Sequence, residues 1–127
     1  MIALDASFVI ALRSTSDAHA DAADAAFSSM RDERCIHPVT LAEILVDPAR
    51  HGREGLVRSA LVDAGISLRQ PDEDEPIRVA QLRVQTRLAL PDCYVLALAD
   101  RTHAAVASFD ARLRAAAAAR GLALVPA

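Results

Sequence analysis

The sequence contains no lysine and no tryptophan, and it has few aromatic residues of any kind. All 14 basic residues are arginine, and 17 aspartates and glutamates bring the formal net charge to −3. A protein that binds nucleic acid through its overall charge is normally basic. Any role in nucleic-acid binding must therefore depend on local arginines or on a bound cation.

Long hydrophobic runs and a signal peptide are also absent. The apolar runs are far shorter than the roughly 20 residues that a membrane-spanning helix needs. The N-terminal stretch MIALDASF has no basic region before its apolar residues and carries an acid at position 5, unlike a secretory signal. These absences predict a cytoplasmic protein with no membrane segment.

Cysteine is scarce, and its spacing excludes the common metal and redox motifs. Cys35 and Cys93 lie in apolar surroundings without CxxC spacing. Reduced, buried thiols are therefore expected in place of a disulfide or a zinc site. The histidines show no HxH or HExxH spacing either, which argues against zinc; they are His19, His37, His51 and His103.

Short apolar runs alternate with amphipathic stretches along the whole chain, and this alternation predicts an α/β fold with a mainly parallel sheet. The chain has 127 residues, which suits a single domain over residues 1–127. The predicted strands are residues 1–4, 34–37, 66–69, 105–108 and 122–125. The predicted helices are residues 7–13, 14–30, 40–49, 53–65, 76–87, 90–103 and 110–120.

Two of these segments have distinctive compositions. The helix over residues 90–103 is apolar almost all round, so it must be buried. The acidic stretch 71–76 is predicted to be a turn whose acids face the positive end of the next helix. A calcium loop is disfavoured there, because the glycine and the alternating ligands of an EF-hand are missing.

Four acidic residues are expected at the beginnings of helices. Asp5 ends the first strand, Glu43 lies in the first turn of the helix over residues 40–49, and Asp110 follows the fourth strand. Helices that follow parallel strands begin at the carboxyl edge of the sheet, where ligands bind, so these three acids should meet there. Asp92 opens the apolar helix, but it follows another helix and not a strand.

Helix capping is the alternative explanation for these acids. Aspartate is a favoured N-cap, and Thr40 with Glu43 fits a T-x-x-E capping box. Four uncompensated carboxylates at one edge, however, would repel by about 4 kcal/mol per pair at 4 Å and an effective dielectric near 20. A divalent cation would remove this cost, and ligands that are all oxygens suit Mg²⁺ or Mn²⁺.

The segments IALDASFVIAL, PVTLAEIL, LPDCYVLALA and ASFDARL, in this order and spacing, resemble the PIN-domain ribonucleases. The resemblance is closest to the VapC-type toxins of VapBC toxin–antitoxin pairs, and it spans the chain. It implies a three-layer fold in which Asp5, Glu43, Asp92 and Asp110 hold the metal ions, with Ser7 and Ser108 in support. The family often has threonine at the position of Ser108 and alanine at that of Cys93.

The resemblance also implies an activity and partners. The expected activity is a metal-dependent endoribonuclease that acts as a toxin and hydrolyses RNA with metal-activated water. Glu43 could also position or deprotonate that water. The expected partners are a cognate antitoxin and a second copy of the chain in a homodimer. By their positions, Arg13, Arg112 and Arg114 are candidates for RNA contacts, although each could be an ordinary surface arginine.

Two alternative functions fit the sequence less well. A haloacid-dehalogenase-like phosphatase needs a second acid two residues after the first, but Ser7 stands at that position. A catalytically silent PIN-like domain that binds RNA or protein remains an alternative. The presence of all four acids favours the enzyme.

Overall fold

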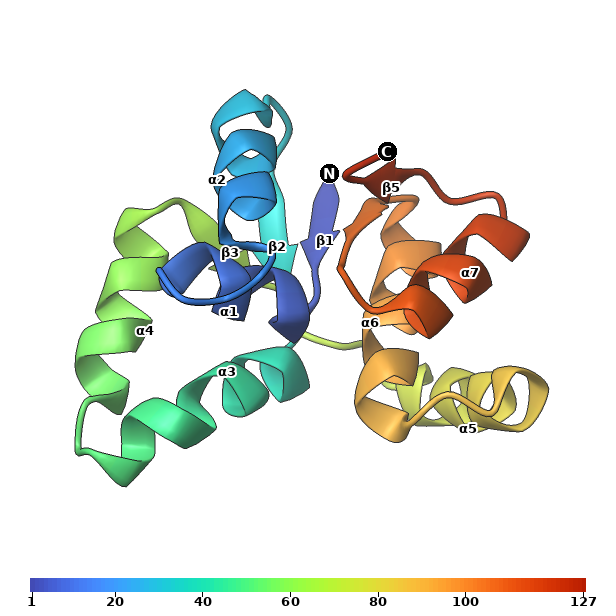
Figure 1. Cartoon of the computed structure of the whole chain (residues 1–127). Coiled ribbons are helices and arrows are strands. Elements are labelled where there is room, and N and C mark those ends of the chain that lie inside the picture. The colour runs from blue at the N-terminus through green and yellow to red at the C-terminus, as the bar shows by residue number, and fades with distance from the viewer.

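A computed structural model describes residues 1–127 as an α/β fold with one parallel sheet between layers of helices (Figure 1). The strands are β1 (Ile2–Leu4), β2 (Arg34–Ile36), β3 (Ile66–Leu68), β4 (Ala105–Ala107) and β5 (Leu124–Val125). The helices are α1 (Ala6–Arg13), α2 (Ala20–Ser29), α3 (Pro38–Arg50), α4 (Glu54–Asp63), α5 (Glu75–Thr86), α6 (Leu90–Thr102) and α7 (Ala111–Ala119). The predicted fold class is confirmed.

The five strands lie in the order β3-β2-β1-β4-β5, and every neighbouring pair is parallel. β1 is the central strand, where Ala3 pairs with Cys35 of β2 and with Val106 of β4. All three residues of β1 are buried, as expected for a strand covered on both faces. The residue that follows β1 therefore lies at the middle of the carboxyl edge of the sheet.

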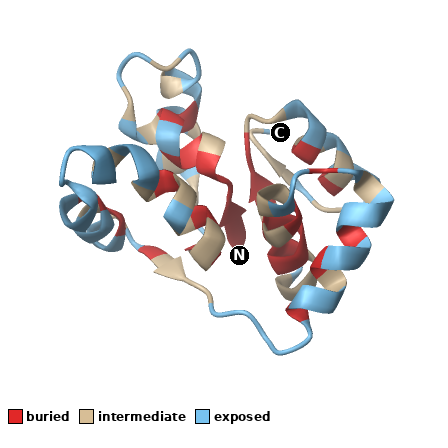
Figure 2. Ribbon diagram, turned by 90° about the horizontal axis from the view of Figure 1, so that it is seen from below, coloured by how far each residue is buried: buried red, intermediate tan, exposed pale blue.

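Successive strand residues point to opposite faces and enter two separate hydrophobic cores. Ala3, Cys35 and Val106 pack with α5, α6 and α7 on one face. Ile2 and Ile36 pack on the other face, with α1, α2, α3 and α4. Figure 2 shows the buried residues along the strands and the inward sides of the helices, with the outward sides exposed.

α6 is the most deeply buried helix, as its composition predicts. The five residues from Val95 to Ala99 are each at most 1% exposed, and the helix contacts both β1 and β4. Cys35 and Cys93 are buried free thiols, which confirms that prediction. None of the helices combines the length and the hydrophobicity needed to span a bilayer.

Two helix beginnings differ from the prediction by more than one residue. α2 begins at Ala20, because the preceding residues form a turn in which the Ser14 hydroxyl and the Asp17 carboxylate accept hydrogen bonds from the backbone. Such short polar side chains compete with the helix for backbone N–H groups. α3 begins at Pro38, since Pro is well suited to the first helical position.

The earlier start of α3 makes the proposed capping box wrong. The N-cap is His37, whose Nδ1 accepts a hydrogen bond from the Val39 N–H at 3.0 Å. Thr40 and Glu43 therefore lie inside the helix, and Glu43 is in its second turn instead of its first. The helix also continues through Pro48 to Arg50, one residue beyond the predicted range of 40–49.

Candidate functional site

Asp5 lies at the carboxyl end of β1, and its carboxylate is fixed by two serine hydroxyls. It is 4% exposed. Its Oδ2 accepts hydrogen bonds from Ser7 Oγ at 2.7 Å and from Ser108 Oγ at 2.8 Å. Ser108 directly follows β4, so these bonds connect the ends of two neighbouring strands. Both serines that the resemblance places in support of Asp5 contact it.

The loop after β4 is tied to the same pair of serines. The Phe109 N–H donates to Ser7 Oγ, and the Asp110 N–H donates to Ser108 Oγ, each at 3.0 Å. The Arg114 guanidinium donates to the Ser108 carbonyl oxygen at 3.0 Å. The backbone that carries Asp110 is therefore held in a fixed relation to Asp5.

Glu43 and Asp92 are half-buried, and burial together with the negative charges of other acids raises the pKa of both carboxyl groups. Burial, followed by the charges of Asp5 and Asp92, raises the pKa of Glu43. Burial, followed by the charges of Asp5 and Asp110, raises the pKa of Asp92 to about 6, against a smaller opposing effect of Arg112. The four carboxylates are thus close enough to interact, and Figure 1 shows α1, α3 and α6 beginning near the lower end of β1.

Capping accounts for only one of the four acids. Asp110 caps α7, because its Oδ1 accepts a hydrogen bond from the Leu113 N–H at 2.9 Å. Asp5 occupies the N-cap position of α1, but its side chain makes no capping hydrogen bond. The N-cap of α6 is Ala89, and Asp92 is the third residue of that helix. Capping therefore does not explain Asp5, Glu43 or Asp92.

The donor set suits a hard divalent cation. All four side chains offer only carboxylate oxygens, and none of them forms an ion pair with an arginine or a histidine. Uncompensated carboxylates repel one another, and no three His, Cys, Asp or Glu side chains converge closely enough to form a preformed ion cage. Mg²⁺ and Mn²⁺ are the cations that such oxygen ligands favour.

The three candidate arginines differ in their surroundings. Arg13 is exposed at the end of α1 and lines a cavity of about 380 Å³ together with Glu43. Arg112 is exposed and donates to the Arg87 carbonyl oxygen at 3.3 Å. Arg114 is half-buried and already bonded to the Ser108 carbonyl. Arg13 and Arg112 therefore have more freedom than Arg114 to meet a ligand.

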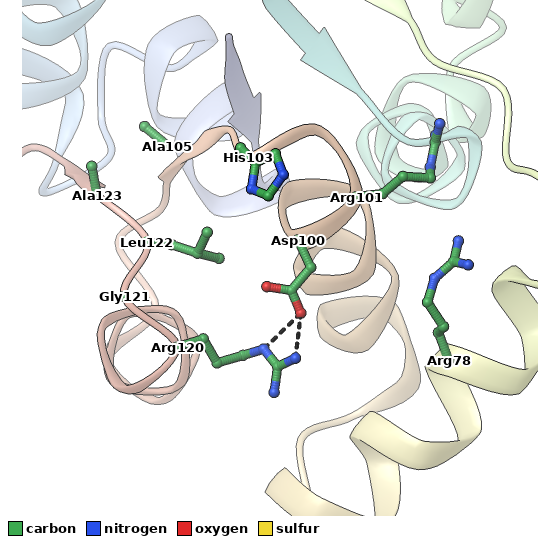
Figure 3. Close-up of a pocket in the computed structure, with 9 residues that line it drawn as sticks. All are labelled: Arg78, Asp100, Arg101, His103, Ala105, Arg120, Gly121, Leu122 and Ala123. Carbon is green, nitrogen blue, oxygen red and sulfur yellow. Dashed lines mark hydrogen bonds and ion pairs between the residues drawn. The ribbon is translucent and has the colours of Figure 1, made fainter.

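The largest cavity lies away from the acids, at the opposite end of α6 (Figure 3). It measures about 710 Å³, and its charged lining residues include Arg78, Arg101 and Arg120. Arg120 is paired with Asp100, its Nε lying 2.6 Å from Oδ2. None of the four acids lines this cavity, so its size does not make it the candidate site.

One buried polar pair was not predicted from the sequence. His37 Nε2 and Glu75 Oε1 are 2.5 Å apart, and the two residues are 3% and 1% exposed. The Tyr94 ring lies 4.8 Å from the His37 ring. Glu75 belongs to the acidic stretch 71–76 that was predicted to form a turn with its acids facing the positive end of the next helix. Nothing in the spacing distinguishes it from its three acidic neighbours, which remain exposed.

A parallel α/β sheet with an acidic cluster at its carboxyl edge defines the class of protein. Residues 2–119 match the family model of the PIN domain, and the chain belongs to that family. No curated protein sequence matches the chain significantly.

Solved structures share the fold at low sequence identity. VapC20 of Mycobacterium tuberculosis, described as a toxin that cleaves the sarcin–ricin loop, is 19% identical with a TM-score of 0.77, covering 91% of this chain and 95% of its own. A toxin–antitoxin complex from Klebsiella pneumoniae is 23% identical with a TM-score of 0.73, covering 87% of each chain. VapBC-1 of nontypeable Haemophilus influenzae is 18% identical with a TM-score of 0.69, covering 98% of this chain and 96% of that one.

Proposed function

We propose that this PIN domain is a metal-dependent endoribonuclease and the toxin of a toxin–antitoxin pair. Asp5, Glu43, Asp92 and Asp110 would hold Mg²⁺ or Mn²⁺ as catalytic residues. The observation that carries the proposal is the electrostatic state of this cluster: burial, followed by the charges of the neighbouring acids, raises the pKa values of Glu43 and Asp92, and no cationic side chain is paired to them. Such a cluster costs folding free energy unless a cation binds it.

The residue types support phosphodiester hydrolysis. A divalent cation held by carboxylates supplies a hydroxide near neutral pH and offsets the charge of the transition state. Asp5, whose Oδ2 accepts from both serines, is suited to direct ligation, as is Asp92. Glu43, on α3, is suited to orient or deprotonate the attacking water. The attacking group in this mechanism is water, so no nucleophilic side chain is required.

The partners follow from the family and the neighbours. Solved neighbours include toxin–antitoxin complexes, which supports an antitoxin as the protein partner of this chain. We also propose that residues 1–127 form one PIN domain and that two copies pair as a homodimer. Arg13 and Arg112 are the stronger candidates for contacts with the RNA backbone, since Arg114 already holds the Ser108 carbonyl.

Cleavage of labelled single-stranded RNA by the purified protein tests this function. EDTA should abolish cleavage, because the proposed reaction requires a cation held by the carboxylates. Mn²⁺ added in excess of the EDTA should restore it. Cleavage that survives chelation would remove the metal mechanism. Binding of RNA without cleavage at any Mn²⁺ concentration would favour the silent PIN-like binding domain.

A further inference from the structure

Three rings form a stack that leads from the core to the surface, and its middle ring belongs to Phe109, the residue before Asp110. The Phe8 and Phe109 ring centroids are 5.5 Å apart with an interplanar angle of 9°, and those of Phe109 and His19 are 4.4 Å apart with an angle of 7°. Phe8 is fully buried, Phe109 is half-buried and His19 is exposed. The stack thus ends in a flat ring at the protein surface.

The stack is rigidly connected to Asp5. Phe109 lies between Ser108 and Asp110, and its N–H donates to Ser7 Oγ, which itself donates to Asp5 Oδ2. Two hydrogen bonds therefore connect the backbone of Phe109, the middle residue of the stack, to the proposed metal ligand. Phe109 is also the residue before Asp110, so the stack adjoins the loop that carries one of the four acids.

His19 is held in place through its backbone. Its N–H donates to Asp17 Oδ1 at 2.8 Å, and its carbonyl accepts from the Ala23 N–H at 2.9 Å. Its side chain does not cap α2, although it stands at the N-cap position. The imidazole therefore contributes a positioned flat surface and not a hydrogen bond that the fold requires.

We propose that His19, supported by Phe109 and Phe8, is a stacking platform for one unpaired base next to the cleaved bond. This inference rests on the proposed ribonuclease function and names how that site holds its substrate. Proteins read single-stranded RNA largely by stacking bases on aromatic and histidine side chains. The sequence has only three phenylalanines and one tyrosine, and two of the phenylalanines are in this stack.

Single-stranded RNA fits the stack better than a protein partner does. Phe109 of the stack directly precedes Asp110, an acid suited to bind a cation and thereby a phosphate, and the exposed Arg112 belongs to the helix that Asp110 caps. Every base offers a flat face, so stacking of this kind selects for unpaired RNA without selecting one sequence. A paired base in a duplex cannot reach such a platform.

Kinetics of His19 variants test the proposal. His19→Ala should raise KM for single-stranded RNA by roughly 5- to 150-fold, the range of base–aromatic stacking, and leave kcat within about threefold of the parent. His19→Phe should restore most of the affinity, since it keeps a flat ring. His51→Ala is the matched control, because His51 is exposed, stacks on no ring and ends α3.

An abasic substitution separates stacking from a structural role. Removing the base that stacks should weaken RNA binding to the parent and to His19→Phe, but hardly to His19→Ala, which has already lost the contact. A thermal melt checks that the variants fold. Equal KM values for the parent and His19→Ala, or a His19→Phe variant as weak as His19→Ala, would overturn the platform.

A fluorescence measurement keeps this inference separable from the nuclease proposal. A short single-stranded oligoribonucleotide that carries 2-aminopurine at each position in turn should be quenched at one position by the parent and not by His19→Ala. If the protein fails to cleave RNA but quenches in this way, the nuclease proposal fails and the platform stands. If it cleaves RNA without any quenching that depends on His19, only the platform fails. In that second case, the exposed His19 ring would be better explained as a contact for a protein partner than for RNA.

Discussion

Asp92 shows at the scale of one residue how the fold places an acid where it is electrostatically unfavourable. It lies in the first turn of α6, and the residues that follow it are buried. Burial of this helix places the Asp92 carboxylate close enough to Asp5 and Asp110 for their charges to raise its pKa. The first cause of its raised pKa is burial, and the second is the charge of Asp5. The metal ligation that we propose for Asp92 would outweigh this cost to stability.

The raised pKa of Asp92 predicts a pH dependence of stability in the presence of EDTA. The folded protein holds a proton on Asp92 up to about pH 6, whereas the ordinary value is 3.8. The folded state thus binds more protons than the unfolded state between these values, so the contribution to stability is full below the lower value and is lost as pH rises through about 6.

Thermal melting of the parent and of Asp92→Asn across this range checks the prediction. The melting temperature of the parent should fall relative to that of the variant as pH rises from 4 to 7, because asparagine does not titrate. The variant also lacks the charge that contributes to the raised pKa of Glu43, and this effect changes the difference in the same direction. If the melting temperature of the parent rises relative to that of the variant as pH increases, the raised pKa of Asp92 is contradicted.

Most elements can be predicted from the sequence because their signals are local. Runs such as MIAL and AVAS are buried on both faces, and the buried helix α6 follows from its composition. The errors also have local causes. The short polar side chains of Ser14 and Asp17 form a turn, so α2 begins later than predicted. His37 caps α3 in place of Thr40, and histidine is not among the residue types that usually cap helices.

The His37–Glu75 pair joins the beginnings of α3 and α5, and it could not be predicted because it forms between segments far apart in the sequence. We expect Glu75→Ala to lower the free energy of unfolding by roughly 3 kcal/mol, since it removes one partner of a buried polar pair. Glu75→Gln keeps an acceptor for His37 Nε2 and should cost about 1 kcal/mol.

Urea denaturation of the two Glu75 variants measures this difference. Glu73→Ala is a suitable control, because Glu73 is an exposed acid of the same stretch. The account requires the alanine variant at position 75 to be clearly the least stable of the three. Equal midpoints for the alanine and glutamine variants would show that the hydrogen bond to His37 contributes little.

At the scale of the whole molecule, large apolar side chains remain exposed on several helices. Val84 is 80% exposed, Leu56 is 67% and Val62 is 64%. Together with the homodimers that the family resemblance implies, this exposure predicts self-association. Light scattering at micromolar concentration should give about twice the chain mass of 13.5 kDa. A mass equal to that of one chain would count against the dimer.

The site could be predicted in part because the topology of a parallel sheet brings the ends of separate strands together. Asp5 and Asp110 follow adjacent strands, so their proximity follows from the element order. Asp92 follows a helix, and only the family resemblance placed it near them. The stacked rings of Phe8, Phe109 and His19 were not foreseen, because their contact depends on where the loop after α1 folds back.

The central claim is that the carboxylates hold a catalytic cation and do not merely stabilise the fold. The most direct test is the rate of single-stranded RNA cleavage at saturating Mn²⁺ by Asp5→Asn and Asp92→Asn, with the exposed Asp24→Asn as control. Asparagine keeps the size and the capping ability of aspartate but removes its charge. The account predicts losses of several orders of magnitude for the first two variants and none for the control. Activity near that of the parent in both site variants would contradict it.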